Sequence, residues 1–133
     1  MNSYLEVLII KIKVKSCLKN INENTEEKNE TNAIKNKNKI TYHDNFSINK
    51  INIYDNKIML VRENDDFIHT FNFEINKETT SEYYIKEYAS SIEVKIKTTK
   101  LVITDNKIEI NYIVKESNEE YNYILDMEWN KWV

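Results

Sequence analysis

The chain of 133 residues contains no glycine and no proline. These residue types dominate tight turns, because glycine tolerates positive φ and proline fixes φ near −65°. Asparagine and aspartate are the next most tolerant of the left-handed backbone region. We therefore expect Asn56 and Asn106, in the related segments "YDNKI" and "TDNKI", to have positive φ in two-residue hairpin turns. Similar corners are expected at 64–66 and 76–77.

Cysteine and long apolar runs are also scarce. The single cysteine, Cys17, cannot form an internal disulfide, which fits a reducing compartment. Near the N-terminus the longest uninterrupted apolar stretch is Val7–Ile10. It is far shorter than the about 7–15 residues of a signal sequence or the about 20 of a membrane span. We interpret this region as a strand and predict a cytoplasmic protein with no membrane partner.

An excess of basic charge is missing as well. The formal net charge is −3, and the sequence pI is about 5.5. A nucleic-acid-binding domain normally carries a basic face, so the charge balance argues against a nucleic-acid partner. The hydrophobic content of 41% is nevertheless sufficient for a folded core. The sequence predicts one folded domain over residues 1–133.

Alternation of apolar and polar residues dominates the chain and is typical of β-strands. The predicted strands cover the following ranges: 8–15, 39–43, 48–54, 58–63, 67–75, 79–88, 92–97, 101–104, 108–115 and 121–129. No amphipathic helical pattern is evident. Sequential strands with one apolar face favour an all-β, antiparallel barrel of about eight to ten strands, since closure removes exposed edges.

The segment Lys19–Lys37 is the exception, because it is highly polar and has few apolar residues to bury. Its composition predicts a long, mobile hairpin or loop. A short strand around Asn32–Lys35 is compatible with the pattern.

From Ile40 to Trp129 the chain resembles the YwiB-like family of uncharacterised bacterial proteins. The blocks that carry the resemblance are "ITYHD", "IMLVREN", "FEINKETTSEYY" and "SSIEVKIKT", with matches at Ile40, Tyr42, Asp44, Arg62, Phe73, Thr79, Tyr83, Ile92, Glu93, Val94 and Thr98. Asn64, Asn76 and Ser90 replace family glycines. The resemblance implies a calycin-like (lipocalin-like) β-barrel and no established activity.

Arg62 is the only arginine in the chain. Where lysine is the usual base, one arginine suggests a need for its planar, bidentate guanidinium group. Its alternation with Ile58 and Leu60 places it inward near one end of the barrel. Arg62 would either anchor a carboxylate or phosphate of a ligand, or pair with a strand carboxylate such as Glu93 or Glu74.

Further candidates lie on the same apolar face. His69 shares the alternation of Phe71 and Phe73, and would be either a hydrogen-bonded core residue or a ligand contact. The aromatic side chains on this face would either line a ligand pocket or fill the interior of the barrel. The candidate ligand-binding residues are Arg62, His69, Phe71, Phe73, Tyr83, Tyr112 and Tyr123.

No spacing in the sequence suggests a catalytic site, a metal site or a cofactor. We therefore predict a non-enzymatic binding module for a small apolar or anionic ligand. The alternative is a protein-interaction module with a filled barrel, which would use exposed Tyr84 and Tyr88 and an unpaired strand edge. The oligomeric state does not follow from the sequence.

Overall fold

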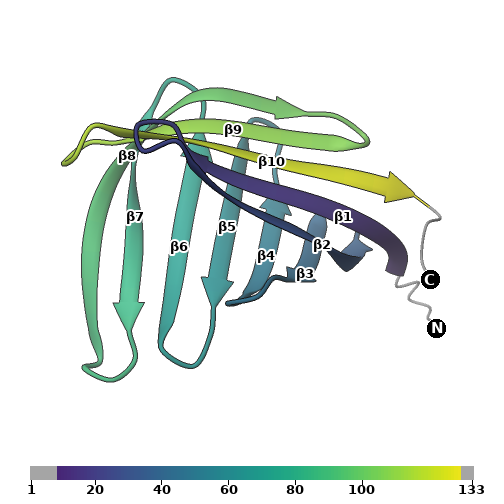
Figure 1. Ribbon diagram of the computed structural model, residues 1–133, viewed down its shortest axis with the longest axis horizontal. Coiled ribbons are helices and arrows are strands. Elements are labelled where there is room, and N and C mark those ends of the chain that lie inside the picture. The colour runs from purple at the N-terminus through teal and green to yellow at the C-terminus, as the bar shows by residue number, and fades with distance from the viewer. Residues whose placement is uncertain (1–8, 130–133) are drawn as a thin grey trace.

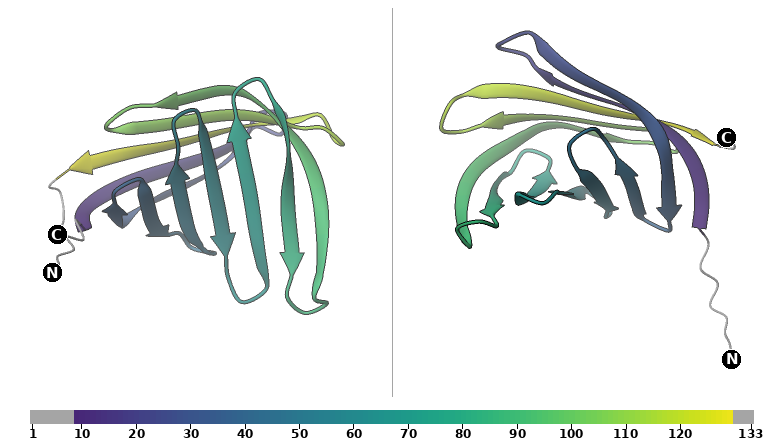
Figure 2. Two further views of the ribbon diagram at one scale, coloured as in Figure 1. Left: turned by 180° about the vertical axis from the view of Figure 1, so that it is seen from behind. Right: turned by 60° about the horizontal axis from the view of Figure 1, so that its bottom comes forward.

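A computed structural model of the chain describes residues 9–129 and contains only β-structure in that range. The ten strands are β1 (Ile9–Asn20), β2 (Thr25–Asn36), β3 (Lys39–His43), β4 (Ile48–Ile53), β5 (Lys57–Glu63), β6 (Phe67–Glu74), β7 (Glu78–Ile85), β8 (Ser90–Ile103), β9 (Lys107–Val114) and β10 (Glu119–Trp129). Each strand pairs antiparallel with the next, and β1 also pairs with β10. The result is a closed antiparallel barrel (Figures 1 and 2), which confirms the predicted fold class.

Most strands lie where the alternation predicts them. The strand β3 has the predicted bounds, Lys39–His43. The start of the first predicted strand, at Leu8, lies outside the described residues. The two strands predicted at 92–97 and 101–104 are one continuous strand, β8, with a β-bulge between Thr98 and Lys100. The bulge shifts the alternation by one residue, so the sequence pattern is interrupted although the strand continues.

The polar segment Lys19–Lys37 forms the end of β1, a turn and the whole of β2. Thus a regular twelve-residue strand occupies most of a segment that the composition predicts to be a hairpin or loop. The register with β1 explains its polarity. Glu27 lies opposite Leu18, and Asn29 lies opposite Ser16. Directly opposed residues of an antiparallel pair share one face of the sheet. The inward positions Glu27 and Asn29 are therefore polar, whereas Ala33, further along β2, is buried in the core.

The turns lie at the predicted places, but the prediction of their conformation is wrong for Asn56 and Asn106. Neither residue has positive φ. Each of the two loops is closed by one backbone bond, from Tyr54 N to Lys57 O (2.9 Å) and from Thr104 N to Lys107 O (2.8 Å). Four-residue loops of this kind are most often built around a type I turn, whose central residues have negative φ.

Positive φ occurs at other turns instead. The described residues that adopt it are Asn24, Lys37, Asn76, Ala89 and Asn118. Asn76, with φ of 60°, is at one of the predicted corners. Three of these positions are asparagine, the residue that best tolerates this region in a chain without glycine.

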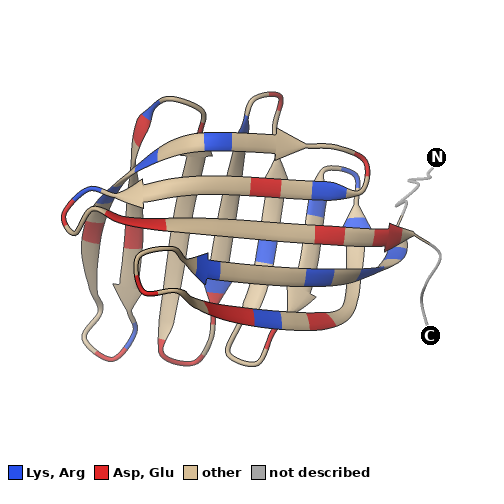
Figure 3. Ribbon diagram, turned by 45° about the horizontal axis from the view of Figure 1, so that its top comes forward, with Lys and Arg blue, Asp and Glu red and all other residues tan. Residues whose placement is uncertain are grey.

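The core consists of the inward side chains of the barrel. Among the largest fully buried side chains are Phe73, Ile12, Ile40, Ile51, Ile58, Ile96, Ile108, Ile110 and Leu125. On the outer surface of β1, β2 and β8–β10, lysines alternate with acidic residues rather than forming a field of one sign (Figure 3). Lys13 pairs with Glu30, and Lys15 Nζ lies 3.6 Å from Glu128 Oε1. Across residues 9–129 no helix is long and apolar enough to cross a membrane.

Candidate functional site

A row of polar side chains crosses the inner face of five neighbouring strands, β3 to β7. Strand register places Tyr42 opposite Asn49, Asn49 opposite Arg62, Arg62 opposite His69, and His69 opposite Tyr83. We call these five residues the polar row. Three predicted site residues, Arg62, His69 and Tyr83, thus stand side by side on β5, β6 and β7. The inward position predicted for Arg62 places it beside the core residue Leu60.

Asp44, in the loop between β3 and β4, anchors one end of this row. Its Oδ1 atom accepts hydrogen bonds from the backbone N–H groups of Phe46 and Ser47, each at 2.8 Å, and from Ser47 Oγ at 3.1 Å. Its Oδ2 atom accepts bonds from Asn49 Nδ2 and Arg62 Nη2, each at 3.0 Å. Five donors therefore saturate one carboxylate that lies between two strands.

This environment keeps Asp44 ionised. Burial alone would raise the pKa of Asp44. The hydrogen bonds from Phe46, Asn49 and Ser47, together with the charge of Arg62, outweigh burial and hold this pKa below its usual value. The carboxylate is thus a permanent negative charge that positions the guanidinium group.

Arg62 has a carboxylate partner, but the predicted partners are wrong. Glu74 pairs with Lys77 at 2.8 Å, and Glu93 is exposed opposite Glu82 on the outer surface. Arg62 instead binds Asp44 through Nη2 and donates from Nε to Asn49 Oδ1 at 3.0 Å. Arginine has five N–H donors, and the two bonds to Asp44 and Asn49 leave the others unused by residues 9–129.

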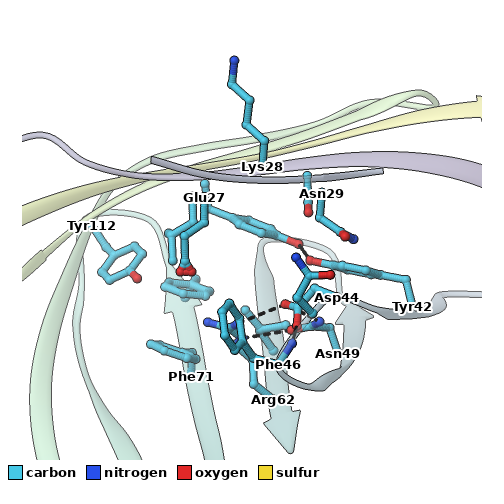
Figure 4. A pocket seen from close by; sticks show the side chains of 16 residues that line it. Glu27, Lys28, Asn29, Tyr42, Asp44, Phe46, Asn49, Arg62, Phe71 and Tyr112 are labelled. Carbon is cyan, nitrogen blue, oxygen red and sulfur yellow. Dashed lines mark hydrogen bonds and ion pairs between the residues drawn. The ribbon is translucent and has the colours of Figure 1, made fainter. Parts of the chain in front are cut away.

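Tyr42, Asn49 and Arg62 of the polar row border a cavity of about 200 Å³ inside the barrel. Figure 4 shows the wall formed by Asp44, Asn49 and Arg62, with Phe71 and Tyr112 across from it. The full lining consists of Ser16, Leu18, Glu27, Lys28, Asn29, Tyr42, Asp44, Asn45, Phe46, Asn49, Leu60, Arg62, Phe71, Phe73, Tyr112 and Tyr123.

The cavity reaches the surface where the barrel wall is incomplete. The strand β2 pairs with β3 only from Ala33 to Asn36, so residues 25–32 pair with β1 alone. Across this gap Asn29 Nδ2 donates to the backbone oxygen of His43 at 3.1 Å. Phe46, in the facing loop, is 64% exposed. We call this gap, between residues 25–32 and the Asp44–Ser47 loop, the mouth of the cavity.

The cavity lining also carries tyrosine hydroxyl groups. The Tyr42 and Tyr123 hydroxyls are 2.6 Å apart and form a buried hydrogen bond. Burial raises the pKa of both phenols, so the pair is neutral. Tyr112 is only 6% exposed, and burial also raises its pKa. Its hydroxyl hydrogen-bonds no residue of the described range 9–129, and its ring extends into the cavity (Figure 4).

The aromatic residues predicted for the site, apart from Tyr123, belong to one continuous cluster. Phe71 stacks on Phe73 at 5.5 Å between ring centroids, and Tyr112 lies 5.0 Å from Phe73. The candidates that line the cavity are Arg62, Phe71, Phe73, Tyr112 and Tyr123.

His69 and Tyr83 do not line the cavity but extend the same aromatic cluster beyond it. The His69 ring lies 3.8 Å from the ring of Phe71 and 5.2 Å from that of Tyr83. Its Nε2 atom is 2.9 Å from Ser81 Oγ. Burial, and then the charge of Arg62, lowers the pKa of His69 to about 4. His69 is therefore a neutral, hydrogen-bonded residue at pH 7.

Sequence analysis missed several lining residues, above all Asp44, Tyr42 and Glu27. Tyr42 and Asp44 lie in the "ITYHD" block, which pointed to a family but not to a site. The pattern D-x-x-S at Asp44–Ser47 is a signal for a side-chain-capped turn and could have placed Asp44. Glu27 gives no such signal, because its inward orientation depends on the pairing of β2 with β1.

Among residues 9–129, no group of three or more His, Cys, Asp or Glu side chains is arranged to hold a metal ion. The fold and site thus define a closed ten-stranded antiparallel barrel with an internal, partly polar cavity.

The structure is similar to the crystal structure of the YwiB protein from Bacillus subtilis, with a TM-score of 0.70 and 16% sequence identity over 92% of each chain. This likeness confirms, at the level of the fold, the resemblance found in the sequence. No family model and no curated protein sequence matches the chain.

Proposed function

We propose that this barrel is a non-enzymatic binding module that holds one small, mainly apolar ligand in its cavity. The observation that carries the proposal is the combination of an aromatic lining with unused polar groups. Tyr112 is 6% exposed and its hydroxyl has no partner among the described residues, and Arg62 keeps unused N–H donors. A ligand that hydrogen-bonds one of these groups would gain about 1 kcal/mol from that bond.

The size of the cavity limits the ligand. At about 200 Å³ it is smaller than the about 300–1,000 Å³ of typical ligand pockets. A compact ligand with one apolar body and one or two polar groups suits this space. The apolar body would lie on Phe71 and Phe73, and the polar groups would face Tyr112 and Arg62.

Filling the cavity tests the proposal. Leu60 lines it and is 6% exposed, whereas Met59 precedes Leu60 on β5 and faces the other side of the sheet. We expect Leu60→Trp to abolish binding of benzyl alcohol and 2-phenylethanol, measured by calorimetric titration. Met59→Trp should bind them like the wild type. The proposal fails if Leu60→Trp binds them as well as Met59→Trp, or if wild type binds neither these alcohols nor charged probes of similar size.

A second variant covers the case in which Leu60→Trp does not fold. Tyr112→Phe removes only the hydroxyl and should keep the ring contacts with Phe73. It should bind each alcohol several-fold more weakly, because the alcohol then loses a hydrogen-bond partner worth about 1 kcal/mol. Equal affinity of Tyr112→Phe and wild type would contradict the proposed site.

Protein interaction is the second candidate. Tyr88, in the turn between β7 and β8, is 70% exposed, and Ile92, near the start of β8, is 52% exposed. Tyr84, in contrast, is half-buried. Because the barrel is closed, β7 and β8 are each paired on both sides. A partner would therefore contact the exposed side chains and would not add a strand to the sheet at this position. Tyr88→Ser together with Ile92→Ser should abolish such an interaction and leave ligand binding unchanged, as measured by light scattering and titration.

We also infer a cytoplasmic, bacterial protein of the calycin-like class. The single cysteine and the resemblance to a bacterial family support this assignment. Localisation of a tagged chain by cell fractionation tests the compartment.

A further inference from the structure

We propose that the ligand of the cavity is a cation: a compact amine or quaternary ammonium compound with an apolar body. This inference rests on the proposed function and names the chemical class of its ligand. It follows from the balance of charges that face the cavity, from the position of Glu27 at the mouth, and from the ring faces beneath it.

Glu27 faces the interior of the barrel. It lies opposite Leu18, which packs against the core, and both residues line the cavity. Figure 4 shows the Glu27 side chain extending from β2 into the cavity, whereas Lys28 points away from it. Within residues 9–129 Glu27 forms no hydrogen bond or ion pair. A free carboxylate thus stands at the entrance.

The other charges of the lining compensate one another or face outward. Arg62 is neutralised by Asp44, with Nη2 and Oδ2 3.0 Å apart. Lys28 lies on the outer surface and binds Glu26, with Nζ and Oε1 3.3 Å apart. Glu27 is then the one uncompensated charge among the four charged residues that line the cavity. A bound anion would add a second negative charge beside the free Glu27 carboxylate. A bound cation would instead neutralise the charge of Glu27.

The aromatic lining also favours a cation. Ring faces attract ammonium groups, and the attraction increases when water is excluded. Phe71, Phe73 and Tyr112 form a cluster with centroid separations of 5.0–6.0 Å. The buried Tyr112 hydroxyl has oxygen lone pairs that can accept an N–H of an amine. The unused N–H groups of Arg62 can bind a neutral acceptor, such as a hydroxyl, on the same ligand.

Three probes of similar size test the charge preference. These are benzyltrimethylammonium (cation), phenylacetate (anion) and 2-phenylethanol (neutral). Their dissociation constants would be measured by calorimetric titration at low ionic strength and pH 7. We expect wild type to bind the cation at least about tenfold more tightly than the anion, equivalent to about 1.4 kcal/mol.

Two charge-removing variants on β2 identify the residue responsible. Glu27→Gln should weaken cation binding by about five- to tenfold and change binding of the alcohol less than about twofold. Glu26→Gln is the comparison, because it removes the same charge from the neighbouring, outward position. It also leaves Lys28 without its partner, and it should still weaken cation binding less than Glu27→Gln does. Glu27 is exposed and unpaired in the range 9–129, so Glu27→Gln should melt like the wild type.

The outcomes separate the two proposals. If the alcohol binds while the anion binds as tightly as the cation, the cation preference is wrong and the cavity still binds ligands. The cation preference is also wrong if Glu27→Gln and Glu26→Gln weaken cation binding equally. If none of the three probes binds to wild type, the proposed function and the cation preference are both overturned.

Discussion

Asp44 holds the loop between β3 and β4 against β4 and β5. Its two oxygen atoms accept bonds from Phe46, Ser47, Asn49 and Arg62. The side chain of Asp44 is 14% exposed and that of Arg62 is 21% exposed. Removing one member of a buried, hydrogen-bonded pair leaves the other charge buried without a partner. The resulting loss of stability is larger than the net contribution of the intact pair.

We expect Asp44→Ala to lower the free energy of unfolding by about 3 kcal/mol. Asp65→Ala is the matched control, because Asp65 is exposed in the loop between β5 and β6. It should change stability by less than about 0.5 kcal/mol. Urea denaturation followed by tryptophan fluorescence would measure both. A loss below about 1 kcal/mol for Asp44→Ala would mean that the loop is held by other contacts.

The folded-state pKa of Asp44 is below its unfolded value. The contribution of the ionised Asp44 to the free energy of unfolding is therefore fully present above pH about 4. The contribution is lost as the pH falls through the folded pKa. The difference in unfolding free energy between wild type and Asp44→Ala should therefore shrink as the pH falls below about 4. Parallel curves down to pH 2 would contradict this assignment.

His69 makes stability depend on pH in a higher range. Its folded-state pKa of about 4 lies below the ordinary value of 6.5. Between these values the unfolded chain binds a proton that the folded chain does not, so stability falls as the pH falls from 6.5 to 4. The loss is at most about 3 kcal/mol, and solvent screening of the partly exposed ring reduces it.

A double substitution isolates this effect. His69→Phe keeps the ring packing, and Ser81→Ala removes the buried hydroxyl that would otherwise lose its partner. We expect the unfolding free energy of this double variant to change less than that of wild type between pH 6.5 and 4. Identical slopes in urea titrations would rule out His69 as the titrating group.

At the scale of single strands, alternation predicts a strand well when its inner face packs against the core. It placed β3 with its observed bounds and both halves of β8. It missed most of β2, because Glu27 and Asn29 face a cavity mouth and need not be apolar. It also divided β8 at Thr98, since a bulge changes which side chains face inward. Local patterns do not encode these long-range features.

The candidate site could be predicted in part for the same reason. Alternation alone places Arg62, Phe71 and Phe73 on the inner face. The partner of Arg62 could not be chosen from the sequence, because Asp44 lies in a loop whose position depends on the pairing of β4 with β5. His69 and Tyr83 were correctly placed on the apolar face, yet the cavity ends before it reaches them.

The turns offer a direct test of backbone strain. Ala89 has φ of 49°, a region in which a β-carbon costs about 1–2 kcal/mol. We expect Ala89→Gly to raise the free energy of unfolding by about 1 kcal/mol, partly offset by the greater entropy of the unfolded chain.

Asn56→Gly is the control, because Asn56 does not have positive φ. It should lower stability by about 0.5–1 kcal/mol, since only the unfolded state gains freedom. The comparison requires chemical denaturation of both variants under one set of conditions. A stabilising Asn56→Gly would show that this turn has a left-handed conformation in solution.

At the scale of the whole molecule, the mouth of the cavity is a weak part of the barrel wall. Residues 25–32 pair with β1 alone, and the segment Lys19–Lys37 is highly polar. Segments with few apolar contacts open locally at a low free-energy cost. We expect limited trypsin digestion to cut first within 19–37 and leave the remainder folded, as judged by mass spectrometry and circular dichroism. First cleavage in another loop, such as that between β9 and β10, would contradict this prediction.

Closure through β1 and β10 determines how this chain must fold. All pairings but that one join strands that follow one another along the chain, so they form as local hairpins. The β1–β10 pairing joins opposite ends of the sequence, such as Ile12 with Trp129, and requires most of the chain to be ordered first. Such long-range contacts slow folding. Because the chain has no proline, no slow prolyl isomerisation phase overlaps with this step in refolding experiments. In pulsed hydrogen exchange during refolding, the amide groups between β1 and β10 should therefore become protected last.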